Sequence, residues 1–408
     1  MAIIVRQVGV VLASLFAAAA LLVFSSAARS EPAENAVDRS PTGAPYAAGE
    51  LIVTYEEGAP DSAVESLDEE VGAEVEEDLP EIDARLLDFP DVKSEPSQAT
   101  RERDLEQIKE DLENDPAVES VGYNYLCRVA YTPRDPKFKY QWGLKKTGFE
   151  SAWNRTRGSG VKVAVVDTGA AVGHVDLRRK VALAWDFVNE DRTVKDLSGH
   201  GTHVSGIVAA RTGNRKGVAG GCPNCKLLIA KVFDGEGTGT IARIADGIIW
   251  SADHGAEVIN LSVVHPSFST VDRNAISYAT DKGAVVVAAA GNGDTNDPRY
   301  PAAYPSVIAV AATNRDDRRA SFSNYGNWLD VAAPGVDILS TIPGGYASRT
   351  GTSMAAPHVS ALAGLLASQG RSPENIENRI THTAVDLGPN GPDPYYGYGR
   401  ISASRAVQ

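Results

Sequence analysis

The feature that most constrains the fold is a series of short, wholly apolar segments separated by segments with helical spacing. Amphipathic helices are expected at 240–255 and 273–283. The apolar segments read as strands: KVAVVDTG (162–169), KLLIAKVF (226–233), EVINLSVV (257–264), AVVVAAAG (284–291) and SVIAVAAT (306–313). Strands that are apolar throughout are typical of a parallel sheet covered on both faces. The pattern predicts a doubly wound α/β domain with a mostly parallel sheet and its active site at the carboxyl ends of the strands.

A change of charge divides the chain. Residues 49–127 contain 25 acidic and 5 basic residues, whereas residues 128–408 contain 25 acidic and 31 basic ones. The acidic segment still shows strand and helix signals in the order βαββαβ, which predicts a small ferredoxin-like α+β domain over 49–127. Residues 29–48 are rich in Pro, Ala and Ser and are expected to form a linker. The net charge of −14 argues against a nucleic-acid binder.

The N-terminus has the pattern of a secretory signal peptide over residues 1–28. A single Arg precedes an apolar stretch from Val8 to Phe24, and Ser26-Ala27-Ala28 forms a small-x-small cleavage site. We therefore expect a secreted protein. A retained membrane anchor is the alternative, because the apolar stretch nearly reaches the length that spans a bilayer.

The three cysteines leave several readings open. Cys222 and Cys225 form a CPNC motif, which fits a redox site, half of a zinc site or a small disulfide loop, and Cys127 stands alone. No second Cys pair exists to complete a zinc site. Export favours a disulfide.

Three polar residues stand at the ends of predicted elements. Asp167 ends the first parallel strand, His200 lies between two glycines at the start of an apolar helix, and Ser353 opens another helix. Each alone is common, since Asp forms turns and Ser often caps helices. Together they can supply a nucleophile, a base with a pKa near neutrality and a carboxylate that orients the base.

The motifs around these residues resemble the signatures of the subtilisin-like serine proteases. They are DTG at 167–169, HGTHVSG at 200–206 and GTSMAAPH at 351–358, in the family's order. YTPRDPKFKYQWGLKK (131–146) and GNWLDVAAPG (326–335) resemble the thermitase branch. The resemblance covers 131–408. It implies a subtilisin-like catalytic domain that hydrolyses peptide bonds through a Ser-His-Asp acyl-enzyme mechanism.

The resemblance also assigns an oxyanion site and a substrate groove. Asn292, in AAAGNG (288–293), is expected to donate to the oxyanion together with the backbone N–H of Ser353. An extended peptide is expected to add as a strand between 234–239 and 261–264. The substrate-binding residues so implied are Gly237, Ser262, Val263, Val264, Ala290, Gly291 and Arg299.

This groove departs from the family pattern in two places. Val264 and His265 stand where the family often has two glycines, which predicts a narrower entrance to the pocket for the P1 side chain, the S1 pocket. Arg299 aligns with the floor of that pocket, where its guanidinium would favour an acidic or polar P1 residue. The alternative is that Arg299 faces solvent or pairs with Asp294 or Asp297.

A structural Ca²⁺ site is also implied by the resemblance to the thermitase branch. Carboxylate, amide and carbonyl oxygens are the ligands that Ca²⁺ prefers. The expected ligands are the side chains of Asp135, Asp176 and Asn214 and the backbone carbonyls of Arg211, Lys216 and Val218. The alternative is a hydrogen-bonded loop without a metal.

The acidic domain resembles the propeptides of this family and lies directly before the protease domain. We expect a cleavable intramolecular chaperone and inhibitor, processed between Tyr125 and Tyr131. Opposite net charges of the two domains favour their association. A permanent accessory domain is the alternative. The expected partners are protein and peptide substrates and the chain's own propeptide, and we expect a monomer.

Two other functions compete with the protease. One is a catalytically silent protein that keeps the groove for binding, which the complete set of Asp167, His200, Ser353 and Asn292 argues against. The other is an α/β esterase. Such enzymes usually carry their serine in G-x-S-x-G, whereas Gly351–Ala355 lacks the second glycine.

Overall fold

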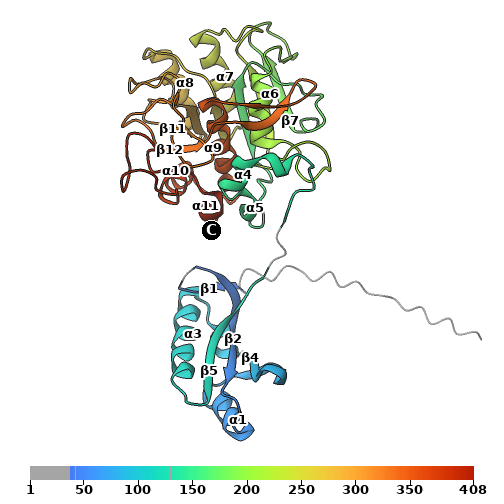
Figure 1. Cartoon of the computed structure of the whole chain (residues 1–408), viewed down its shortest axis with the longest axis vertical. Helices are drawn as coiled ribbons and strands as arrows, with labels where there is room; N and C mark the ends of the chain where they lie inside the picture. The colour runs from blue at the N-terminus through green and yellow to red at the C-terminus, as the bar shows by residue number, and fades with distance from the viewer. Residues whose placement is uncertain (1–36, 42, 128–130) are drawn as a thin grey trace, which may run out of the picture. The chain divides into compact units, whose positions relative to one another are not determined.

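The computed structural model describes residues 37–41, 43–127 and 131–408. It divides into two units, Met1–Cys127 and Arg128–Gln408 (Figure 1). The predicted signal peptide lies outside the described residues. Within the described part of the chain, no helix combines the length and the apolarity needed to cross a membrane.

The first unit is an antiparallel sheet with helices, in the predicted βαββαβ order. The central strand β2 (Pro45–Tyr55) pairs with β5 (Val118–Tyr125) on one side and β4 (Ala84–Asp88) on the other. The remaining elements are β1 (Val37–Arg39), α1 (Asp61–Glu70), β3 (Glu74–Leu79), a 3-10 turn (Pro80–Ile82), α2 (Pro90–Ser94) and α3 (Gln98–Glu113). Strand β3 pairs with β4 and forms one edge of the sheet. This arrangement confirms the predicted ferredoxin-like domain.

The segment predicted as a linker differs from that prediction. Within 29–48, β1 is a strand and β2 begins at Pro45. Tyr46 is fully buried, and Asp38 is buried in a bidentate pair with Arg101 at 2.7 and 3.0 Å. These strands were not predicted because the segment is rich in Pro and Ala and has no apolar alternation. One buried aromatic residue, Tyr46, and one buried ion pair, Asp38–Arg101, hold them in place instead.

The second unit is built on a parallel sheet of seven strands in the order β12-β11-β10-β9-β6-β8-β7. The strands are β6 (Lys162–Asp167), β7 (Val181–Asp186), β8 (Lys226–Lys231), β9 (Val258–Leu261), β10 (Val285–Ala289), β11 (Val307–Thr313) and β12 (Val331–Pro334). A separate hairpin pairs β13 (Ile338–Ile342) with β14 (Gly345–Arg349). The predicted doubly wound parallel sheet is confirmed.

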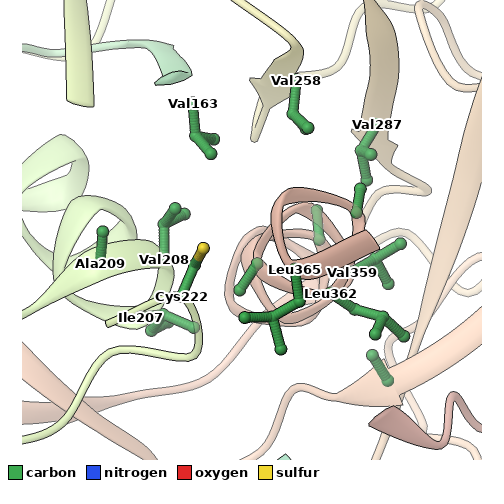
Figure 2. Close-up of a cluster of buried hydrophobic side chains, with 14 of the residues drawn as sticks. Val163, Ile207, Val208, Ala209, Cys222, Val258, Val287, Val359, Leu362 and Leu365 are labelled. Atoms are coloured by element: carbon green, nitrogen blue, oxygen red, sulfur yellow. The ribbon is translucent and has the colours of Figure 1, made fainter. Parts of the chain in front are cut away.

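Helices cover both faces of this sheet. On one face of the sheet, Val163 of β6 shares a hydrophobic core with α6 (His200–Ala209) and α9 (Thr352–Ala367). On the other face, Ala164 of β6 shares a second core with α7 (Ile241–Asp253) and α8 (Thr270–Asp281). In Figure 2 the strand valines face the buried side of α9, and α6 lies beside it. The shorter elements are a 3-10 turn (Phe138–Tyr140), α4 (Trp142–Lys146), α5 (Phe149–Ala152), α10 (Pro373–His382) and α11 (Ala403–Ala406).

The CPNC motif forms a disulfide. Cys222 and Cys225 are bonded, with Cα atoms 5.4 Å apart, and both are fully buried. Cys127 is free and exposed. Of the three readings of this motif, the structure therefore has the disulfide loop.

Candidate active site

Two of the predicted catalytic residues are in direct contact at the carboxyl edge of the sheet. Asp167 is the last residue of β6 and His200 is the first residue of α6. The Nδ1 atom of His200 lies 2.8 and 3.0 Å from the two carboxylate oxygens of Asp167, which is 1% exposed. Because a carboxylate only accepts hydrogen bonds, Nδ1 carries the proton and Nε2 is left as a base.

The electrostatics of His200 favour its protonated form. Burial of the ring disfavours the charge, but the adjacent Asp167 carboxylate more than offsets burial and holds the pKa of His200 above its ordinary value. Arg349 acts against this shift and Asp196 adds to it. Stabilisation of an imidazolium is what a general base needs once it has accepted a proton.

Asp196 is a site residue that the sequence reasoning missed. Its carboxylate is buried, and each of its oxygens accepts two hydrogen bonds. The donors are Thr168 Oγ1 at 2.9 Å and Gly199 N at 2.7 Å to Oδ1, and Thr202 N at 2.8 Å and Thr202 Oγ1 at 2.6 Å to Oδ2. It thereby joins the end of β6 to the start of α6. The signal that could have identified it is an Asp four residues before His200, just ahead of a helix start.

Ser353 lies at the start of the buried helix α9. Its hydroxyl donates to the carbonyl of Ser262 at 3.2 Å, and Ser262 Oγ donates back to the carbonyl of Ser353 at 3.0 Å. Residues 131–408 show no hydrogen bond between Ser353 and His200. The structure thus joins Asp167 to His200 directly and places Ser353 beside the same cleft through Ser262.

That cleft has a volume of about 290 Å³ and is lined by two of the four predicted catalytic residues. Its lining includes Asp167 and His200, together with the predicted groove residues Gly237, Ser262, Val263 and Val264. A larger cavity of about 1210 Å³ lies along β7 and contains none of the three predicted triad residues. The smaller cleft is therefore the candidate active site.

Asn292 is oriented for donation. Its Oδ1 accepts from the backbone N–H of Thr352 at 2.9 Å and from Thr352 Oγ1 at 3.0 Å. A backbone N–H can only donate, so the carbonyl end of the amide must face Thr352 and the Nδ2 end faces away. The side chain is exposed. This leaves an N–H group at the opening of α9, where the helix N-terminus also favours negative charge.

The other predicted groove residues, Ala290, Gly291 and Arg299, are not in the lining of this cleft. Ala290 and Gly291 are buried, and Gly291 has φ +102°, a conformation that disfavours a side chain. The Arg299 guanidinium is 3.8 Å from the carboxylate of Asp297, whereas Asp294 pairs with Arg319 at 2.9 Å. The alternative pairing of Arg299 with Asp297 is thus present at long range, and its effect on substrate choice stays a prediction.

The predicted metal ligands include two buried carboxylates. Asp135 and Asp176 are 4% and 0% exposed, and neither has a Lys, Arg or His within ion-pair distance among the residues that the structure describes. Burial raises the pKa of Asp135, and nearby Asp176 acts in the same direction while backbone N–H bonds oppose it. Asn214 Nδ2, Val218 N and Tyr346 Oη donate to Asp176 at 2.7, 3.0 and 2.9 Å, and the N–H groups of Gly213 and Asn214 donate to Asp135 at 2.6 and 3.2 Å. The structure therefore shows the hydrogen-bonded loop of the alternative reading. Two buried carboxylates without a paired cation are the feature of this loop that a hard divalent ion would suit.

Comparisons with known proteins agree with this site. Residues 158–399 match the subtilase family, and residues 32–124 match the fervidolysin N-terminal prodomain. A thermophilic serine proteinase of Bacillus sp. (strain AK1) is 45% identical over 369 residues, which are 89% of this chain and 92% of that protein.

Two further relatives each align with 68% of this chain. Thermitase of Thermoactinomyces vulgaris is 49% identical over 280 residues, which are 68% of this chain and all of thermitase. A protease structure from Pseudoalteromonas arctica aligns with a TM-score of 0.63 at 34% identity and covers 68% of this chain and 99% of that one. The chain therefore belongs to the subtilase family of serine proteases and carries an N-terminal prodomain.

Proposed function

We propose that the chain is a secreted serine endopeptidase, made as a zymogen, that works through Ser353, His200 and Asp167. The observation that carries the proposal is the arrangement at the edge of the sheet. The His200–Asp167 pair lies in the cleft with Ser262, which is hydrogen-bonded to Ser353 near the start of α9, and Thr352 of the same helix orients the Asn292 amide. A nucleophile, a base and an oxyanion donor are the parts that acyl transfer requires.

In the proposed mechanism, Ser353 Oγ attacks the carbonyl carbon of the scissile bond and His200 Nε2 accepts its proton. The Asp167 carboxylate stabilises the resulting imidazolium. Asn292 Nδ2 and the backbone N–H of Ser353 donate to the oxyanion. Collapse of the tetrahedral intermediate breaks the C–N bond, and His200 protonates the leaving amine.

The second half of the reaction repeats these steps with water. His200 removes a proton from water as its oxygen attacks the acyl carbon, and Ser353 Oγ leaves with that proton. The hydroxyl of Ser353 donates to Ser262 O in this structure, so its O–H must redirect to donate to His200. Substrate backbone bound along 261–264 would occupy the carbonyls of that edge and favour this turn.

We propose that the first unit is an inhibitory propeptide. Its match to a prodomain family and its excess of acidic residues support this role. Thermitase aligns over its whole length with 280 residues of this chain, which is about the length of Arg128–Gln408. Cleavage between Tyr125 and Tyr131 would release it.

We propose a Ca²⁺ ion as a structural component only. Asp135, Asp176 and Asn214 would hold it with the carbonyls of Arg211, Lys216 and Val218. The ion would neutralise the two buried carboxylates and fix the loop after α6. It takes no part in the chemical steps.

The test is to express the full chain and treat the culture medium with a fluorophosphonate, casein and a short-chain ester. Labelling and casein cleavage are expected in wild type and in Ser348→Ala, an exposed serine on β14, and both are expected to vanish in Ser353→Ala. Fluorophosphonate labelling together with hydrolysis of the ester, but no hydrolysis of casein, would support the esterase. No labelling of folded, processed protein would support a silent binding protein.

A further inference from the structure

The rim of the cleft after β9 carries side chains that reach across the groove. Val264 is 46% exposed. Its Cγ1 lies 3.5 Å from the position that a β-carbon on Gly291 would take. Since a Cα–Cβ bond is about 1.5 Å long, Val264 Cγ1 is no more than about 5 Å from Gly291 Cα. Val264 thus nearly closes the gap between the two walls at that level.

The wall that carries Gly291 is held in place. Its N–H donates to Thr352 Oγ1 at 3.0 Å, and its carbonyl accepts from the N–H of Asn324 at 2.9 Å. Asn324 Nδ2 also donates to the carbonyl of Ala290 at 2.8 Å. A β-carbon on Gly291 would also clash with Asn324 Nδ2. These hydrogen bonds fix the backbone of Ala290 and Gly291 opposite Val264.

The segment that carries Val264 is held as well. Its neighbour His265 exchanges two backbone hydrogen bonds with Tyr300, at 2.7 and 3.0 Å, and the two rings stack with centroids 6.1 Å apart. His265 Nε2 lies 3.0 Å from the carboxylate of Asp272, which is fully buried in the first turn of α8. The His265–Asp272 contact ties the rim to a helix of the second core.

Phe268 and Tyr304 complete the support. Both pack edge-on or tilted against Tyr300, with centroids 5.8 and 4.7 Å away. The Tyr304 hydroxyl also donates to the carbonyl of Ser269 at 2.9 Å and accepts from the N–H of Ser269 at 3.0 Å, just ahead of α8. An aromatic cluster of this kind resists small displacements of the backbone that it covers.

We propose that Val264, held by the His265–Asp272 contact, restricts the P1 residue of the substrate to glycine, alanine or serine. This rests on the proposed protease function. A carbonyl bound at Asn292 and Ser353 places the P1 side chain between the walls of Val264 and Gly291. A flat ring needs wall atoms about 7 Å apart, because each face makes contacts at about 3.5 Å. The gap here is smaller, so an aromatic or long P1 side chain does not enter.

The test compares three peptide substrates that differ only in P1: Ala, Phe and Glu. Values of kcat/KM are normalised to the concentration of sites that a fluorophosphonate titrates, so loss of folded protein does not enter the ratio. Wild type is expected to favour Ala over Phe by tenfold or more, the range that steric exclusion from a pocket gives. Val264→Gly is expected to raise the Phe-to-Ala ratio at least tenfold.

Val172→Gly is the matched control. Val172 is 45% exposed, in a turn outside the cleft, so the same atoms are removed from a residue of the same exposure. Its Phe-to-Ala ratio is expected to equal that of wild type. An unchanged ratio in Val264→Gly would overturn the proposal, as would a wild type that prefers Glu and loses this preference in Arg299→Ala.

His265 is tested as a positioning residue. His265→Leu removes the contact with Asp272 and is expected to raise KM for the P1-Ala peptide and relax the Phe-to-Ala ratio, with a smaller change in kcat. His265→Gln keeps an N–H donor for Asp272 and is expected to restore the wild-type ratio. A loss of titratable sites with an unchanged ratio in His265→Leu would show a role in folding only and refute the positioning role.

The proposed function and the P1 restriction are refuted by different results. If wild type neither labels with fluorophosphonate nor cleaves casein, the proposed function fails. If it does both but cleaves the Ala and Phe peptides equally well, only the P1 restriction fails.

Discussion

Replacing Asp196 by Asn is expected to destabilise the catalytic unit because its carboxylate accepts four hydrogen bonds in the interior. Two of the donors are the backbone N–H groups of Gly199 and Thr202, one to each oxygen, and neither can rotate. Whichever way the Asn amide turns, its NH₂ group faces one of them. One buried N–H is then left without a partner.

The magnitude follows from these bonds. An unsatisfied buried N–H costs about 1–3 kcal/mol, and the remaining bonds each lose about 1 kcal/mol when the acceptor is no longer charged. Two such bonds bring the expected loss to about 3–5 kcal/mol. Because Asp196 also contributes to the raised pKa of His200, the same substitution is expected to lower the pH at which activity is lost.

The stability measurement is best made in a Ser353→Ala background, which prevents self-digestion, by urea unfolding of the variant with and without Asp196→Asn. Asp246→Asn on α7 is the control, since Asp246 is exposed and its replacement is expected to change stability by less than about 0.5 kcal/mol. A loss below about 1 kcal/mol for Asp196→Asn would refute the reasoning about its hydrogen bonds.

Four further measurements test the remaining parts. Activity is expected to fall on acidification through a pKa above the ordinary value for histidine, because His200 must be neutral to act and its pKa is raised; a midpoint in kcat/KM at or below the ordinary value would contradict this. Asn292→Ala is expected to reduce kcat about 10²–10³-fold with little change in KM, and an equal rise in KM would place Asn292 in ground-state binding instead. Chelation is expected to lower the unfolding temperature of wild type, because the folded protein loses about 2.7 kcal/mol of stability if the ion had been present at a hundred times its Kd. In Asp176→Asn, chelation is expected to leave the unfolding temperature unchanged. N-terminal sequencing of the secreted enzyme is expected to begin at Tyr131, because Ala130 is the one small residue in the processing segment, and a start after a large residue would count against the narrow pocket.

Much of the catalytic unit could be predicted because its information is local. Each central strand is an uninterrupted apolar run, and parallel strands buried on both faces leave no room for another pattern. The edge strand β7 and the short strand β12 were not predicted as strands. Leu183 in β7 is 45% exposed, and β12 ends in Pro334, so both lack the signature of a buried strand.

The site itself was predictable only in part. Asp167, His200 and Asn292 lie at element ends where motifs mark them, and the structure brings the first two into contact. The direction of the Ser353 hydroxyl, toward Ser262, depends on a rotamer that no pattern in the sequence records. The approach of Val264 to Gly291 depends on how two separate loops are placed in the fold. From the sequence, Val264 in place of a glycine indicated only that the entrance to the S1 pocket is narrower.

The helix that carries Ser353 is also one of the helices that pack against the sheet. Val359, Leu362 and Leu365 on α9 are fully buried against strand residues of the same core (Figure 2). A change in that packing is therefore expected to move Ser353, whose hydroxyl is the proposed nucleophile. Adaptation of such an enzyme to heat or cold is therefore expected to proceed through its loops and its surface, because a substitution in the buried face of α9 would change thermal stability and catalytic rate together.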